Sequence, residues 1–92
     1  MGLITLDQAK RDLSVLSSDR DADIADKIEQ ASEIVVDYLK RPDHGWTDTT
    51  APQVVRAAVS LVLRHLFYGE DGDPITEGVR SLLHRMRDPA FA

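Results

Sequence analysis

Apolar side chains recur along the chain at the three- and four-residue spacing of an amphipathic α-helix. The clearest run is one stripe formed by Ile24, Ile28, Ala31, Val35 and Leu39. Because this spacing places side chains on one helical face, the pattern predicts helices at about 6–15, 21–39, 52–68 and 75–87. No segment alternates for long enough to predict a strand. We therefore expect an all-α fold, a small four-helix bundle-like single domain (residues 1–92) with a short first helix.

Polar residues at the predicted helix ends indicate how each helix begins. Thr5 and Gln8 have the spacing of a capping box, in which Thr5 accepts from a backbone amide and Gln8 reaches back to the cap. Residues 17–19, Ser-Ser-Asp, offer an N-cap for the second helix. Thr49 or Thr50 can cap the third helix, ahead of a proline near its first turn.

Two features leave alternatives open. An irregular polar loop at residues 41–51, between the second and third helices, holds the only tryptophan, Trp46. A lone tryptophan in such a loop either folds back onto the core, the commoner arrangement, or anchors an interface. The third helix is apolar on nearly all sides, so it is either a central helix wrapped by the other three or a helix with one face against another subunit.

Composition narrows the class of protein. The chain has 92 residues, no cysteine and a formal net charge of −5. The absence of cysteine excludes disulfides, thiolate catalysis and cysteine-ligated zinc. We find no signal peptide and no apolar run of transmembrane length, so we expect a soluble protein made in the cytoplasm. Residues 1–39 carry nine acids against four bases, whereas residues 75–92 are mildly basic, which would suit head-to-tail contact between copies.

The motifs of catalysis and metal binding fail at specific positions. The acids at residues 19–23 resemble the start of a calcium loop, but Ile24 and Gln30 occupy the positions that need glycine and glutamate. His44, His65 and His84 lack the spacing of a metal-binding pair. No nucleophile elbow or phosphate loop is present. We therefore expect no enzyme activity, no metal and no cofactor.

A small helical DNA-binding regulator remains an alternative. Arg80, His84 and Arg87 share one face of the last predicted helix, as a recognition helix would require. The acidic net charge opposes high non-specific affinity for DNA. An antitoxin-like interaction module is a further alternative.

Several segments, taken in order, resemble one protein family. They are Ile4-Thr5-Leu6-Asp7-Gln8-Ala9-Lys10, the acidic residues 19–24, the helix end Tyr38-Leu39-Lys40-Arg41, the loop with Trp46, the helix start Pro52-Gln53-Val54-Val55-Arg56-Ala57-Ala58-Val59, and the closing residues 79–90 with Leu82-Leu83 and Arg87-Asp88-Pro89-Ala90. Their order and spacing over nearly the whole chain resemble the head-tail connector (head-completion adaptor) proteins of long-tailed double-stranded DNA bacteriophages.

The resemblance implies a structural virion protein at the head-tail interface. Copies would form a ring, expected to be dodecameric, that docks under the portal protein, meets a downstream tail-completion protein and continues the DNA channel without sequence-specific DNA binding or membrane contact. On this hypothesis the candidate portal or subunit contacts are Trp46, Leu63, Phe67, Arg85, Arg87 and Phe91. The candidate channel-facing acids are Asp19, Asp21 and Asp23.

Overall fold

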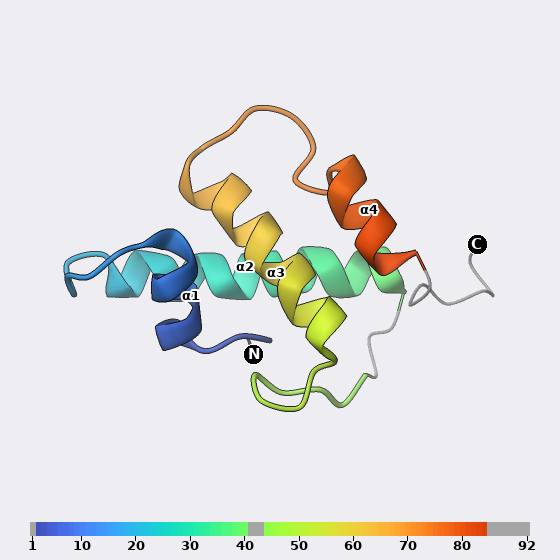
Figure 1. Cartoon of the computed structure of the whole chain (residues 1–92), viewed down its shortest axis with the longest axis horizontal. Helices are drawn as coiled ribbons and strands as arrows, with labels where there is room; N and C mark the ends of the chain where they lie inside the picture. Colours follow the sequence, from blue (N-terminus) through green and yellow to red (C-terminus); the bar gives the residue numbers. More distant parts are fainter. Residues whose placement is uncertain (1, 41–43, 85–92) are drawn as a thin grey trace.

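Four helices, and no strand, make up the part of the chain that the computed structural model describes, residues 2–40 and 44–84 (Figure 1). The helices are α1 (Leu6–Leu13), α2 (Asp21–Leu39), α3 (Gln53–Phe67) and α4 (Glu77–Leu83). The all-α prediction is confirmed. The predicted bounds of the long second helix are those observed, α1 and α3 are shorter than expected, and α4 begins two residues later than expected. The last predicted residues of that helix, 85–87, lie outside the described residues.

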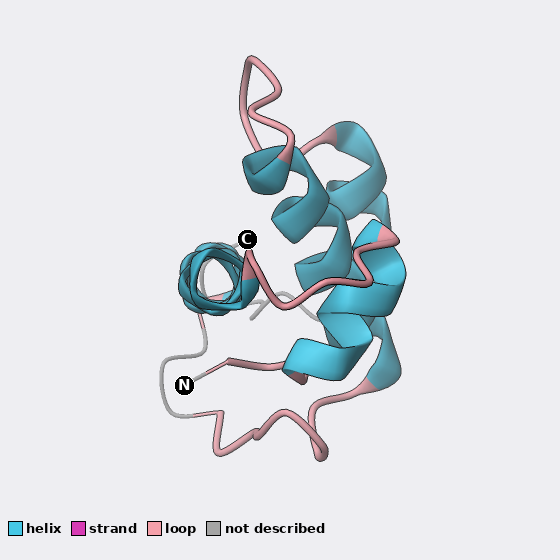
Figure 2. Cartoon of the chain, turned by 90° about the vertical axis from the view of Figure 1, so that its left-hand side faces the viewer, coloured by secondary structure: helices cyan, strands magenta, loops and turns pink. Residues whose placement is uncertain are grey.

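The helices form two layers. Viewed from one end, α2 is seen along its axis on one side, and α1, α3 and α4 lie together on the other (Figure 2). α3 crosses α2 rather than running alongside it, with α1 and α4 to either side (Figure 1). The predicted stripe on α2 is the face that packs inward, since all five of its members are buried.

α3 is the central helix of the fold. It packs against α2, α4 and α1. Its fully buried side chains are Val55, Ala58, Val59, Val62 and Leu63. Contacts within the subunit therefore explain most of the apolar surface of this helix, because a helix that is covered on several sides needs apolar side chains on several faces. Val54 and Leu61 remain exposed on it, by 39% and 44%.

The segment before α1 is fastened to α2 through a buried serine. Leu3 and Ile4 are buried with the core, and Ser32 is the buried polar residue beneath them. The Ser32 hydroxyl donates to the Ile28 carbonyl (2.7 Å) and accepts from the Leu3 amide (3.0 Å). One hydroxyl thus satisfies a backbone amide that would otherwise be buried without an acceptor.

The ends of α1 differ in part from the expectation. Thr5 caps the helix by accepting from the Gln8 amide (3.1 Å), as predicted. The reciprocal bond of the capping box is absent, because the Gln8 side chain donates to Asp12 instead. The helix ends at Leu13, two residues before its predicted end, and the next residue, Ser14, adopts a left-handed conformation (φ 59°). There the Val15 amide bonds to the Lys10 carbonyl (2.9 Å), completing a Schellman motif.

The predicted caps of α2 and α3 are wrong. Arg20 occupies the N-cap of α2, and no side chain caps that helix. Pro52 occupies the N-cap of α3, also without a side-chain bond. The Thr50 hydroxyl is instead used inside the preceding turn, where it accepts from the Thr47 amide (2.8 Å). At α4, Thr76 is the cap, accepting from the Val79 amide. The helix therefore begins after the buried Ile75, not at it.

Candidate functional site

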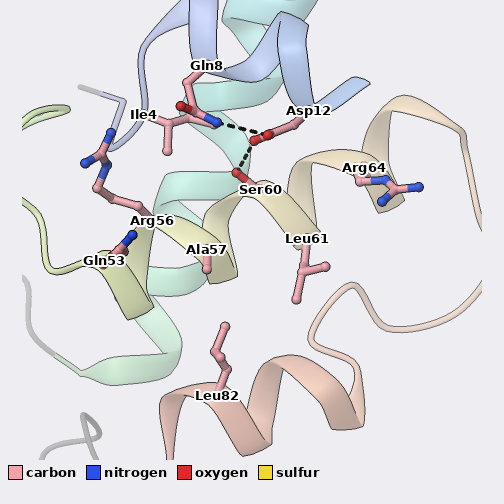
Figure 3. A pocket seen from close by; sticks show the side chains of 10 residues that line it. All are labelled: Ile4, Gln8, Asp12, Gln53, Arg56, Ala57, Ser60, Leu61, Arg64 and Leu82. Atoms are coloured by element: carbon pink, nitrogen blue, oxygen red, sulfur yellow. Dashed lines mark hydrogen bonds between the residues drawn. The ribbon is translucent and has the colours of Figure 1, made fainter. Parts of the chain in front are cut away.

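A groove of about 640 Å³ opens between α1, α3 and α4 (Figure 3). Its walls combine apolar, hydrogen-bonding and basic side chains. The apolar wall includes Ala57 and Leu61 from α3 and Leu82 from α4. Leu61 and Leu82 point into the space between those two helices (Figure 3). An open, mixed surface of this kind suits a protein segment better than an enclosed small molecule.

The polar end of the groove is formed by side-chain hydrogen bonds centred on Asp12. Asp12 accepts from the Ser60 hydroxyl at 2.6 Å and from the Gln8 side-chain amide at 3.0 Å (Figure 3). Asp12 and Ser60 lie 48 residues apart, so this contact ties α1 to α3. The Ser60 hydroxyl donates its hydrogen bond to a carboxylate rather than to a histidine that could activate it as a nucleophile. The pair therefore positions two helices.

Two arginines from α3 flank the groove. Arg56 and Arg64 extend on opposite sides of it (Figure 3). The Nε atom of Arg56 is buried and lacks a hydrogen-bond acceptor among the described residues. Arg64 is exposed, and neither arginine has an ion-pair partner within the described part of the chain. The groove thus offers positive charge beside an apolar wall.

The residues expected to contact the portal or a neighbour take different positions. Trp46 is half-buried and packs against the core, and its ring stacks on His44 (5.0 Å between centroids), which favours the fold-back arrangement. Phe67 is half-buried beneath the Arg20 guanidinium, 4.6 Å from the ring centroid. Leu63 is fully buried and is reassigned from the interface to the core, because α3 turns that face toward its neighbouring helices. Arg85, Arg87 and Phe91 lie outside the described residues.

The three acids expected to face a channel are not equivalent. Asp21 contacts the Lys10 ammonium at 2.8 Å as an ion pair, without the alignment of a hydrogen bond. Asp23 accepts from Lys27 (2.9 Å) and from Arg20 (3.0 Å). The Lys27 hydrogen bond, followed by that of Arg20, lowers the pKa of Asp23 below its ordinary value.

Asp19 stands apart from the other two acids. It is exposed and has no ion-pair partner in the described segments. Asp21 and Asp23 each pair with neighbouring cations, so Asp19 is the one of the three acids without such a partner among the described residues. Among residues 2–40 and 44–84, no group of three or more acids or histidines is placed to hold a metal ion.

One arginine of the basic face that a DNA-recognition helix would require is engaged in an ion pair within the chain. Arg80 of α4 contacts Asp73 at 3.3 Å, and Asp73 also accepts from the Ile75 amide (2.9 Å). Asp73 thus organises the turn before α4, as aspartates in turns commonly do. Within the described ranges, no helix is long and apolar enough to cross a membrane.

The sequence pattern did not reveal the most exposed large apolar residue of the ranges 2–40 and 44–84. Leu16, in the loop between α1 and α2, has 98% of its surface exposed. The only signal for it is a leucine next to the polar run Ser17-Ser18-Asp19-Arg20, off the stripe of either helix. The groove beside Leu61 was also not predicted, since it depends on three helices meeting.

Comparisons of the chain with protein-family models, with curated proteins and with solved structures found no match.

Proposed function

We propose that this protein is a structural subunit that assembles with copies of itself into the ring joining a phage capsid portal to its tail. The observation that carries the proposal is that two apolar side chains are exposed in different places, Leu16 on a loop and Leu61 in a groove. A closed ring requires each subunit to offer two different surfaces, one to each neighbour. The order of family-like segments along the chain supports the same assignment.

The charge on α2 supports a channel-lining role for that helix. Asp26, Glu33 and Asp37 are exposed, and their spacing of seven and four residues puts them on one stripe. That stripe lies opposite the buried face of α2. In this proposal α2 faces the lumen, where carboxylates repel the DNA phosphates and allow the DNA to slide. Asp26, Glu33 and Asp37 thereby take over the role first expected of the ion-paired Asp21 and Asp23.

The test of the proposal is docking to the portal vertex. Purified chain is mixed with DNA-filled, portal-bearing capsids that lack it, and the vertex is imaged by electron cryomicroscopy. The proposal expects a ring under the portal and recovery of tail attachment. Capsids that neither bind the chain nor gain tails would refute it. The deletion of residues 87–92 in the same assay tests the contact that the resemblance assigns to the chain end.

The lumen assignment has a separate test. The triple variant Asp26→Lys, Glu33→Lys, Asp37→Lys should dock normally but slow DNA ejection from assembled particles, because phosphates would bind the channel wall. A matched control is Glu77→Lys on α4, an exposed acid on the other layer. Equal ejection rates for the triple variant and the control would show that this stripe does not face the DNA.

A further inference from the structure

The side chain of Leu16 is almost fully exposed to solvent. Its 98% exposure compares with 55% for Tyr68 and 44% for Leu61, the next most exposed large apolar residues in the described part of the chain. It lies in the loop that leads from α1 into α2, which forms one end of the molecule (Figure 1). Burying a leucine this exposed against an apolar surface would lower the free energy, because it removes apolar area from water.

The loop that carries Leu16 is braced at both ends. Before it, the Val15 amide bonds to the Lys10 carbonyl, and the Tyr68 hydroxyl donates to the Leu13 carbonyl at 3.2 Å. After it, the Arg20 guanidinium lies over the Phe67 ring. The end of α3 therefore holds the loop in place. A loop whose backbone is already held in place loses less entropy when it binds, which favours the use of Leu16 as a contact.

The groove carries an apolar side chain followed by a basic one, and the loop carries an apolar side chain followed by an acidic one. Leu61, Ala57 and Leu82 provide an apolar wall, and Arg64 follows Leu61 by three residues on α3, on the same side of the helix. In the loop, Asp19 follows Leu16 by the same three residues. Asp19 and Arg64 are exposed, opposite in charge and without ion-pair partners among the residues described.

We propose that the loop of one copy docks into the groove of the next copy, with Leu16 against Leu61 and Leu82 and with Asp19 beside Arg64. The contact joins two different surfaces, so it is head-to-tail and repeats around a ring or along a filament. This inference rests on the proposed function, because it identifies the subunit contact of that ring. It also assigns Asp19 to a neighbour rather than to the channel.

The strength of one such contact is limited. Removing Leu16 from water corresponds to about a 10- to 100-fold gain in affinity. An exposed ion pair such as Asp19 with Arg64 adds at most about fivefold. Pairs of free subunits would therefore associate weakly, and a template that holds neighbours side by side would raise their effective concentration and complete the ring.

Cross-linking between two single-cysteine chains tests the contact directly. The protein has no cysteine, so Ser17→Cys, next to Leu16 in the exposed loop, and Leu61→Cys each introduce one thiol while Leu16 is kept. The two chains, carrying tags of different mass, are mixed, and a short bismaleimide is added with and without portal-bearing capsids. We expect the mixed dimer to dominate over either self-dimer. Val54→Cys, exposed on α3 outside the groove, replaces Leu61→Cys as the matched control. Cross-linking to Val54→Cys as efficient as to Leu61→Cys would overturn the inference.

A charge exchange provides a second test that does not use cysteines. Asp19→Arg and Arg64→Asp should each weaken ring occupancy at the portal by about two- to fivefold at low salt. The double variant should recover it, because the pair is restored in reverse. Leu16→Ala should weaken occupancy by about 10-fold or more. If the charge exchange fails to recover occupancy and Leu16→Ala binds like the parent chain, the contact is not the one proposed.

The inference and the proposed function can fail separately. A ring at the portal whose copies do not cross-link from position 17 to position 61 would overturn the inference and leave the function standing. A specific cross-link in solution combined with no binding to capsids would support the contact and refute the portal assignment. No specific cross-link under either condition would overturn the inference.

Discussion

Replacing Ser32 by alanine removes the hydroxyl that connects the first residues of the chain to α2. Ser32 is 3% exposed, and the amide it serves belongs to Leu3, which is 1% exposed. In the variant, the Leu3 amide remains buried at the same place without an acceptor. The Ile28 carbonyl is less affected, since it belongs to the interior of α2, where carbonyls accept helical hydrogen bonds.

The expected loss of stability follows from these contacts. A buried amide left without a partner costs about 1–3 kcal/mol. Alanine returns up to about 0.5 kcal/mol through its higher helix propensity. We therefore expect Ser32→Ala to lower the free energy of unfolding by about 1–2.5 kcal/mol. A domain of this size has a total of about 5–14 kcal/mol, and the melting temperature should fall by about 5–15 °C.

Urea unfolding followed by circular dichroism at 222 nm measures this change, with the slope against denaturant checked for constancy. The matched control is Ser81→Ala, the same substitution at an exposed site on α4, which should be neutral or slightly stabilising. Native-state hydrogen exchange should show faster exchange of the Leu3 amide in Ser32→Ala. If the two variants unfold at the same urea concentration and Leu3 exchange is unchanged, the bridging role of Ser32 is wrong.

Three further predictions concern the helix ends and the contacts between helices. Ser14→Gly should stabilise the domain by about 0.5–1 kcal/mol in urea unfolding, because glycine adopts the observed left-handed conformation without strain; a loss of stability would contradict the cap geometry. Ser60→Ala should lower stability by about 1.5–3 kcal/mol by removing a hydrogen bond to the Asp12 carboxylate, and a neutral effect would contradict it. The pKa of Asp23 is lowered in the folded state, so its contribution to stability is present above the ordinary aspartate pKa and is lost as pH falls through the lowered value. Lys27→Met should raise that pKa in an NMR titration; an unchanged titration would show that Lys27 does not act on it.

Local sequence signals predicted those features that depend on neighbours in the chain. The stripe from Ile24 to Leu39 identified α2, since apolar residues three and four apart persist over about four turns. Thr5 was identified as a cap because a threonine hydroxyl just before a helix can accept from an amide of the first turn, and here it accepts from Gln8. The caps expected from Thr49 and Thr50 failed because the same hydroxyls can also close a local turn, and here the turn uses them.

The geometry of the candidate site depends on contacts between residues that are far apart in the sequence. Ser60 bonds to Asp12 across 48 residues and Tyr68 to Leu13 across 55, and no local pattern specifies either pair. Those pairings set where the loop with Leu16 projects and where the groove beside Leu61 opens. The sequence by itself determined an all-helical domain with an acidic first half, because helix periodicity and charge are properties of neighbouring residues. Only the tertiary structure decided that Leu63 is covered and Leu16 is exposed, because burial depends on which helices meet, and the apolar character of a leucine is the same in both places.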